Sequence, residues 1–358
     1  MTNVPIAPVA LFVFNRPMFT SRVFERLREL RPPRLLVVAD GPRPMQPEDV
    51  QLCRATRKIV TSPDWECELL TNVATENMGC RSRMASGLDW VFQQCSEAII
   101  LEDDCLPHSS FFRFCSEMLS HYREDARIMH VSGDNFQGGR RRGNGSYFFS
   151  RYSLSWGWAS WRRSWRYFDL TIPSWPLARK ERWLESILEN PLELKYWTSI
   201  FDRVYRGQMD AWDYQWQFTC WSQSGLSIQP NDNLVSNIGV GPDSTHFKQG
   251  PTSVIGIPVR ELGKVAHPSA MVPNREADRY YFQEHIMKSK RLRNRIARFL
   301  AVRTKRLLLS SPSNDVKPRT LKDGVADHRG ASVGPSNTSV KSPSLRHTHD
   351  DTDAIHGA

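Results

Sequence analysis

The sequence lacks the features that mark a secreted, disulfide-bonded or zinc-binding protein. Its seven cysteines form an odd set without a Cys-x-x-Cys pair, which argues against a structural zinc site and against a complete disulfide framework. The amino-terminal stretch has no basic region with a small-residue cleavage site, and no apolar run reaches the roughly 18 residues that a membrane span needs. We therefore expect reduced thiols and a cytoplasmic location, either free or peripheral at the inner face of the membrane.

Positive charge is concentrated late in the chain. The formal net charge is +10, but the earlier part mixes both signs, so we expect no nucleic-acid partner. Residues 279–309 predict a basic amphipathic helix, and its part 286–308 is suited to peripheral contact with an anionic membrane. Residues 310–358 contain almost no large apolar side chain and predict a disordered tail. The main domain is then expected over 1–250, followed by an extension over 251–309.

Short apolar runs alternate with amphipathic stretches in the early part of the chain. The apolar runs have the length of buried parallel strands and stop at polar or Gly/Pro-marked turns. Predicted strands cover 9–14, 35–39, 66–70, 98–101 and 128–131, and predicted helices cover 20–30, 48–60, 83–94 and 111–122. The alternation predicts an α/β fold with a mostly parallel central sheet flanked by helices, in which ligands bind beyond the carboxyl ends of the strands.

Polar residues follow three of these predicted strands. Asn15 and Arg16 come after the first strand, Asp40 comes after the second, and the acidic run 102–104 comes after the fourth. Because the carboxyl ends of parallel strands share one edge of a sheet, we expect these side chains to line one cleft.

The acidic run predicts a site for Mn²⁺ or Mg²⁺. Hard divalent ions prefer carboxylate oxygens and keep open positions for phosphate and water. We expect Asp104 to be the direct ligand, Asp103 to act through water or a ribose, and Glu102 to hold the loop beside the metal. The alternative is a solvated turn at the end of a strand.

Five short motifs together resemble a bacterial branch of family 2-like glycosyltransferases. They are Phe14-Asn15-Arg16-Pro17, Ala39-Asp40-Gly41-Pro42-Arg43, Asn77-Met78-Gly79-Cys80, Ile100-Leu101-Glu102-Asp103-Asp104-Cys105 and Trp156-Gly157-Trp158-Ala159. The similarity spans residues 8–247. Its second half is similar to N-acetylglucosaminyltransferase I, an inverting GT-A enzyme with an acidic metal motif, a tryptophan-glycine segment and a later tryptophan-aspartate motif. That last motif differs, because the animal enzyme has two adjacent aspartates where this chain has Asp213-Tyr214.

The resemblance implies a GT-A type nucleotide-diphospho-sugar transferase fold for the main domain, and a nucleotide-sugar donor of the UDP type. It places Asn15 and Arg16 near the nucleotide and Asp40 against uracil or ribose. Asn77 and Gly79 would approach the donor ahead of the metal loop. The implied reaction moves a hexosyl or N-acetylhexosaminyl group to a hydroxyl of a glycan or lipid-linked acceptor, with inversion, as in bacterial polysaccharide biosynthesis.

Asp213 is the candidate general base of such a transfer. Its carboxylate would accept the proton of the acceptor hydroxyl as that hydroxyl attacks the anomeric carbon. Flanking Trp212, Tyr214 and Trp216 would exclude water from it, which raises its pKa, and would offer the acceptor sugar a stacking surface. The alternative is that Asp213 caps the helix that follows it. Most other tryptophans between 152 and 221 are interpreted as large core residues.

His246, Arg83 and Gly157 each have a functional and a structural interpretation. His246 either reaches back to the metal or the diphosphate, or is a satisfied polar side chain. Arg83 either contacts the phosphate or sugar of the donor, or forms an ion pair at the surface. Gly157 either lets the backbone approach the transferred sugar, or makes a tight turn in the core.

Two other functions are compatible with the sequence. A sugar-phosphate nucleotidyltransferase also uses an α/β sheet, a nucleotide and Mg²⁺, but it would favour a glycine-rich phosphate loop, and the loop 15–18 has no glycine. A non-enzymatic protein would act on membranes or nucleic acid through the basic helix. In that case, deletion of the helix would abolish the activity and replacement of Asp104 would not.

Overall fold

The computed structural model describes residues 4–239 and 257–288, which belong to one compact unit. His246, the predicted basic helix beyond residue 288 and the predicted tail 310–358 lie outside these ranges. Within the described ranges, no helix is both long and apolar enough to cross a membrane. Along the chain the elements are β1 (Val9–Val13), α1 (Pro17–Leu30), β2 (Arg34–Ala39), α2 (Glu48–Val60), β3 (Glu68–Val73), α3 (Gly79–Gln94), β4 (Glu97–Glu102), β5 (Cys105–Pro107), α4 (Ser109–His121), β6 (Ile128–Ser132), β7 (Tyr147–Ser150), β8 (Trp158–Trp161), α5 (Arg162–Trp165), α6 (Trp175–Lys180), α7 (Trp183–Ile187), α8 (Pro191–Tyr205), α9 (Asp213–Ser222), β9 (Leu226–Pro230), β10 (Val235–Asn237), α10 (Arg275–Tyr281) and the π-helix η1 (Phe282–Met287).

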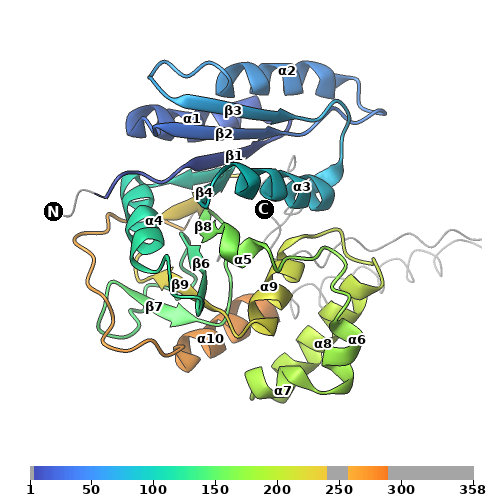
Figure 1. Ribbon diagram of the computed structural model, residues 1–358, viewed down its shortest axis with the longest axis vertical. Coiled ribbons are helices and arrows are strands. Elements are labelled where there is room, and N and C mark those ends of the chain that lie inside the picture. The colour runs from blue at the N-terminus through green and yellow to red at the C-terminus, as the bar shows by residue number, and fades with distance from the viewer. Residues whose placement is uncertain (1–3, 240–256, 289–358) are drawn as a thin grey trace, which may run out of the picture. The chain divides into compact units, whose positions relative to one another are not determined.

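Eight strands form one central sheet in the order β3-β2-β1-β4-β8-β6-β9-β7, with β3 at one edge and β7 at the other (Figure 1). The strands β3, β2, β1 and β4 are parallel, whereas β8 and β7 run antiparallel to the strands beside them. The apolar runs of β1 and β2 are buried along their whole length or nearly so, as parallel strands covered on both faces require. The prediction of an α/β fold with a mostly parallel central sheet flanked by helices is confirmed.

The alternation of side chains along the strands divides the core between the two faces of the sheet. Val9, Leu11 and Val13 of β1 pack in a cluster that includes residues of α1, α2 and α4. Ala10 and Phe12 point to the other face, where α3, α5 and α9 supply the packing partners. Because β4, β8 and β6 alternate in direction and β9 is parallel to β6, the strands β6 and β9 end at the same edge of the sheet as β1, β2 and β4.

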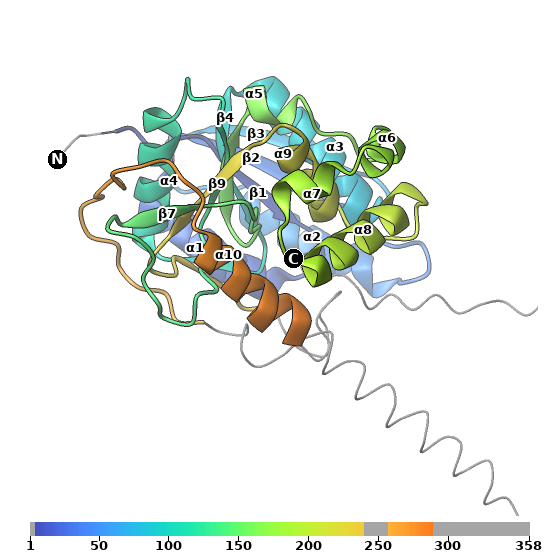
Figure 2. The same cartoon turned by 90° about the horizontal axis from the view of Figure 1, so that it is seen from below.

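The tryptophan-rich segment forms core, as the sequence predicted. The ring of Trp158 in β8 stacks on that of Trp212, with centroids 5.6 Å apart. Helix α9 is buried on every side, because Trp216 packs toward the sheet while Tyr214 packs in the cluster that includes α8. Figure 2 shows α6, α7 and α8 grouped next to α9. The prediction that Trp212, Tyr214 and Trp216 offer an acceptor sugar a stacking surface is wrong. Their side chains are buried, with exposed fractions of 0%, 0% and 1%.

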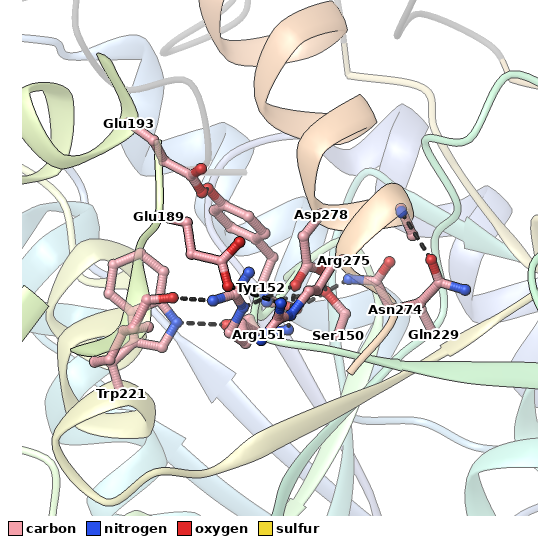
Figure 3. Close-up of polar contacts among 12 residues, drawn as sticks. Ser150, Arg151, Tyr152, Glu189, Glu193, Trp221, Gln229, Asn274, Arg275 and Asp278 are labelled. Atoms are coloured by element: carbon pink, nitrogen blue, oxygen red, sulfur yellow. Dashed lines mark hydrogen bonds and ion pairs between the residues drawn. The ribbon is translucent and has the colours of Figure 1, made fainter. Parts of the chain in front are cut away.

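Residues 257–288 are bound to the edge strand β7. The carboxylate of Asp278 in α10 accepts hydrogen bonds from Ser150 Oγ at 2.6 Å and from Arg151 Nε at 3.1 Å (Figure 3). The helix that the sequence predicted from residue 279 therefore begins earlier, with α10, and its first turns pack on the sheet.

The cysteines agree with the prediction of reduced thiols. All seven are free; five are buried, and Cys67 and Cys80 are partly buried.

Candidate functional site

A pocket of about 270 Å³ lies at the carboxyl ends of β1, β2 and β4. We call it the acidic pocket, because five carboxylates but only three arginines are among the described residues that line it. Asn15, Gly157 and Asp213 are not among the lining residues. The residues predicted from the sequence that do line it are Arg16, Asp40, Asn77, Gly79, Arg83, Glu102, Asp103 and Asp104.

The local sequence directs Arg16 toward the end of β4. Pro17 occupies the first turn of α1, where its missing N–H costs no hydrogen bond. Arg16 precedes this proline and is the N-cap of α1, with φ −117° and ψ 69° outside the helical region. Its Nη1 lies 2.8 Å from Asp104 Oδ2 and 3.6 Å from Asp103 Oδ1. One guanidinium therefore bridges two successive carboxylates.

Strand β10 and the residues after it hold Asp104 from the other side. Antiparallel pairing of Asn237 with Cys105 brings Asn237 Nδ2 to 3.4 Å from Asp104 Oδ1. The backbone N–H of Ile238 donates to the carbonyl of Asp104 at 2.8 Å. Gly239 lies so close that a Cβ there would be 2.1 Å from Asp104 Oδ2. No sequence signal predicted β10, so these contacts were missed.

The acidic run carries more negative charge than its one guanidinium neutralises. Burial raises the pKa of Asp103 to about 7, against the opposing charge of Arg16. Burial, followed by the charges of Asp104 and Asp103, raises the pKa of Glu102 well above its usual range. Burial also opposes the charge of Arg16, but Asp103 and Asp104 outweigh it and raise the pKa of the guanidinium. A further cation here would stabilise the ionised carboxylates.

The side chains of the acidic run have the chemistry that a hard divalent cation needs. In the described part of the chain, however, no three or more His, Cys, Asp or Glu side chains are already arranged to hold a metal ion. Oε1 of Glu102 is buried and has no hydrogen-bond partner, so this oxygen needs a proton or a cation. Carboxylate oxygens are the ligands that Mn²⁺ and Mg²⁺ prefer. Because Arg16 occupies Asp104 Oδ2, a cation that binds this oxygen must share it with the guanidinium or displace it.

Asp40 fixes the turn that follows β2. Its carboxylate accepts hydrogen bonds from the N–H of Gly41 at 2.8 Å, the N–H of Met78 at 2.9 Å and Nδ2 of Asn77 at 2.9 Å. Asp40 and Asn77 therefore lie together at the pocket and join the end of β2 to the loop before α3, while their contacts with a donor stay predictions.

Helix α3 begins at the pocket. Gly79 has φ +74°, and no side chain caps the first turn of the helix. The N–H groups at such a helix start favour an anion. Further along α3, the buried guanidinium of Arg83 donates to the carbonyls of Ala39 and Asn72 at 3.1 and 2.5 Å. Arg83 is therefore not a surface ion-pair partner; it joins β2 to β3 beside the pocket.

Asn15 supports the loop rather than lining the pocket. Its Nδ2 donates to Asp49 Oδ1 at 2.7 Å, and Arg43 Nε donates to Asp49 Oδ2 at 2.6 Å. The hydrogen bonds from Arg43, ahead of that from Asn15, lower the pKa of Asp49. Asn15 thus fixes the position of the chain just before Arg16.

Asp213 is a buried, unpaired carboxylate at the start of α9. It is 4% exposed, and neither carboxylate oxygen has a hydrogen-bond partner. The side chain forms no cap at the start of the helix, so the alternative role as a helix cap is not supported. Burial raises the pKa of Asp213 to about 7. The charge of Asp213 also contributes, after burial and the neighbouring carboxylates, to the raised pKa of Glu102, so it lies near the acidic pocket.

Gly157 makes a tight turn in the core. Its φ is +66°, and a Cβ there would lie 2.7 Å from Val235 Cγ2 and 3.3 Å from Leu101 Cδ2. Its carbonyl accepts the N–H of Gly133 at 2.7 Å. These contacts support the structural interpretation of this glycine, because the space beside it is filled by protein.

Asp210 lines the acidic pocket and was not predicted. It lies in the loop before α9, close in sequence to Asp213. The sequence signal that could have found it is a second aspartate three residues before Asp213, the first residue of α9.

Comparisons with known proteins give a likeness in structure but none in sequence. No protein-family model matches this sequence, and a comparison with curated proteins found no match. A cytidylyltransferase from Leptospira borgpetersenii is 9% identical over 45% of this chain and 63% of its own, with a TM-score of 0.29. UDP-glucose pyrophosphorylase in complex with UDP-glucose is 8% identical over 45% of this chain and 78% of its own, with a TM-score of 0.27. Mouse xyloside xylosyltransferase 1 is 12% identical over 59% of this chain and 80% of its own, with a TM-score of 0.30. At such low identities and TM-scores, these likenesses carry no argument about function.

Proposed function

We propose that this protein is a GT-A type glycosyltransferase that moves a sugar from a nucleoside-diphosphate donor to a hydroxyl group, with inversion at the anomeric carbon. The acidic pocket carries the proposal, because carboxylates 102–104, the guanidinium of Arg16 and the start of α3 meet in one space. The leaving diphosphate of such a donor needs cations and N–H groups around its oxygens. The motifs that resemble glycosyltransferases support a donor of the UDP type.

The residues of the pocket would divide the work of holding the donor. Arg16 and the uncapped start of α3 would bind phosphate oxygens, while Asp103 would accept a ribose hydroxyl. Oδ2 of Asp103 is kept in place by the N–H of Phe14 at 3.3 Å. A bound Mn²⁺ or Mg²⁺, held by Asp104 with Glu102 beside it, would neutralise charge on the departing diphosphate.

Asp213 would act as the general base. Burial gives its carboxyl group a pKa of about 7, so it ionises near neutral pH and can take the proton of an acceptor hydroxyl. Its two oxygens have no partner among the described residues, but they are buried, so the chain before α9 would have to move for the carboxylate to meet an acceptor hydroxyl. The hydroxyl oxygen forms the new bond to the anomeric carbon, and the bond to the diphosphate breaks on the opposite face.

Calorimetric titration with UDP and Mn²⁺, with and without EDTA, tests the donor site. We expect UDP to bind in a metal-dependent way, and Asp104→Ala to lose this binding. Asp64→Ala is the matched control, because Asp64 is an exposed carboxylate that pairs with Arg28 on the surface; it should bind like the wild type.

The products then separate the two enzyme classes. A glycosyltransferase releases UDP from a UDP-sugar, whereas a nucleotidyltransferase releases pyrophosphate from a nucleoside triphosphate and a sugar phosphate. Absence of UDP binding by folded wild-type protein would reject the UDP donor.

A further inference from the structure

A second pocket, of about 480 Å³, lies at the same edge of the sheet as the acidic pocket. It is lined by residues that follow β6, such as Asn135, and residues that follow β9, such as Asn233, together with 257–260 and 280–288. Strands β6 and β9 end at the edge of the sheet where β1, β2 and β4 end, so both pockets lie at that edge. We call this space the second pocket.

The floor of the second pocket is fixed by amide side chains that already have partners. Asn233 Oδ1 accepts the N–H of Asn135 at 2.9 Å, and Asn135 Nδ2 donates to the carbonyl of Pro230 at 2.6 Å. Asn231 Oδ1 accepts the N–H of Arg142 at 2.7 Å. Since these amides bind the protein itself, the pocket keeps its shape without a ligand.

Three positive and two negative side chains are among the described residues that line the second pocket, so one positive charge is not neutralised. Arg141 pairs with Asp232 at 3.2 Å, and Lys288 pairs with Glu284. The fifth charged lining residue is Arg260. Its backbone N–H donates to the carbonyl of Asn233 at 2.8 Å, but its guanidinium has no hydrogen bond or ion pair within the described ranges of the chain. A spare guanidinium at the mouth of a polar pocket favours an anionic ligand.

His285 adds an unpaired acceptor to the pocket wall. It is 9% exposed, and its Nε2 donates to the carbonyl of Phe136 at 2.7 Å, because a carbonyl can only accept. Burial lowers the pKa of His285, so the ring is neutral near pH 7. Nδ1 is then an acceptor, and it has no partner. A hydroxyl group is the donor that such a nitrogen lacks.

A short stretch of chain joins the two pockets. Asn233 lines the second pocket, and six residues later Gly239 touches Asp104 of the acidic pocket. Six residues of extended chain span at most about 22 Å. The antiparallel pairing of β10 with β5 holds this stretch in place. The span between these two residues is therefore no longer than a molecule of a few sugar rings.

We propose that the second pocket binds the acceptor, and that the acceptor carries a sugar with a carboxylate or phosphate group. Arg260 pairs with that anionic group, and His285 accepts a hydroxyl of the same sugar after a small displacement of the ring. This assignment rests on the proposed glycosyltransferase function, but the preference of the pocket for an anionic sugar is measured independently of it.

Saturation-transfer NMR with three small sugars tests the preference. The probes are glucuronic acid, glucose 1-phosphate and the neutral methyl glucoside, each titrated into the full-length protein with saturating UDP and Mn²⁺ present. We expect at least one anionic probe to bind roughly tenfold more tightly than methyl glucoside, as a charge-assisted hydrogen bond provides. The two anionic arms distinguish a carboxylate from a phosphate.

Variants assign the preference to this pocket. Arg260→Gln should remove the difference between anionic and neutral probes, and Arg260→Lys should restore much of it. Arg22→Gln, at an exposed arginine of α1, should leave the difference unchanged. Equal binding of all three probes, or a preference that survives Arg260→Gln, would overturn the proposal.

UDP titration keeps the two proposals apart. Metal-dependent UDP binding with no anionic preference would leave the glycosyltransferase proposal standing and reject the acceptor class. A preference for anionic sugars that depends on Arg260, without any UDP binding, would support the anionic-sugar site. It would reject the role of that site as the acceptor site of a UDP-dependent transferase.

Discussion

The acidic pocket and the second pocket share one edge of the sheet but differ in what their polar atoms lack. In the acidic pocket, the unpaired buried oxygen belongs to the carboxylate of Glu102, and the two unpaired oxygens of Asp213 lie nearby. In the second pocket, the buried amides are satisfied, and the unpaired groups are the guanidinium of Arg260 and a ring nitrogen of His285. The unpaired oxygens of the acidic pocket favour a bound cation, whereas the unpaired groups of the second pocket favour an anion that also carries hydroxyl groups.

Loss of the Asp213 carboxylate should separate the chemistry of the acidic pocket from binding in the second pocket. We expect Asp213→Asn to lower kcat for sugar transfer by roughly 10²- to 10⁴-fold, because a general base contributes about that factor. The Kd for UDP and the binding of anionic sugars should change by less than about threefold. Steady-state kinetics and calorimetry measure the two effects.

Asp64→Asn serves as the control for this substitution and should transfer sugar like the wild type. A loss of less than tenfold in Asp213→Asn would mean that Asp213 is not the base. The next candidate is then Asp134 after β6, which is 1% exposed and has an Oδ1 without a hydrogen-bond partner.

The buried carboxyl group of Asp213 should also make stability depend on pH. Its pKa is about 7 in the folded protein and about 3.9 in an unfolded chain. The folded state therefore keeps its proton to higher pH, so this group lowers the stability of the wild type progressively from about pH 4 to about pH 7. The free energy of unfolding of Asp213→Asn, relative to wild type, should rise by about 3 kcal/mol between pH 5 and pH 8.

Urea unfolding of the metal-free proteins across this pH range measures the difference. Asp64→Asn, at an exposed carboxylate, is measured beside Asp213→Asn as the control substitution. Parallel curves for Asp213→Asn and wild type would show that the carboxyl group keeps an ordinary pKa. No corresponding pH dependence is expected from the satisfied asparagines of the second pocket.

Removal of the Arg16 guanidinium should tighten cation binding in the acidic pocket. Arg16 Nη1 lies 2.8 Å from Asp104 Oδ2, so it competes with a cation for that oxygen. We expect Arg16→Gln to bind Mn²⁺ roughly tenfold more tightly in the absence of nucleotide. A tenfold change in affinity corresponds to the free energy of about one charge-assisted hydrogen bond. Calorimetry with Mn²⁺ alone provides the measurement.

The matched control is Arg43→Gln. Arg43 also lines the acidic pocket, but it pairs with Asp49 and not with the acidic run, so Mn²⁺ affinity should stay within about twofold of wild type. Weaker Mn²⁺ binding in Arg16→Gln would show that the guanidinium supports the cation instead of competing with it.

Much of the acidic pocket was predictable because several of its lining residues follow strands that the sequence marks clearly, whereas Asp210 in the loop before α9 was missed. The apolar runs before Asn15, Asp40 and Glu102 give strands of the parallel half, and the shared edge of such strands brings the polar residues together. The GT-A type assignment and the metal remain predictions, because they rest on the resemblance of motifs.

The second pocket was not predictable, for two physical reasons. Its walls come from four separate segments, near 135, 231, 257 and 285, whose approach depends on pairing between distant parts of the chain. The short strands β7, β8 and β10 have three or four residues each, too few to show a period. Helix α9 is buried on all sides and alternates polar with apolar residues, so it has no amphipathic helical pattern to read.

The buried cysteines have a practical consequence for work on this protein. Burial raises the pKa of every one of the seven thiols, to about 11 for Cys53 and Cys95. Very little thiolate then exists near pH 7, and the native chain should react slowly with alkylating reagents. A cysteine placed at Met45, which is 87% exposed in the loop between β2 and α2, would carry a fluorescent label beside the acidic pocket without removal of the natural seven.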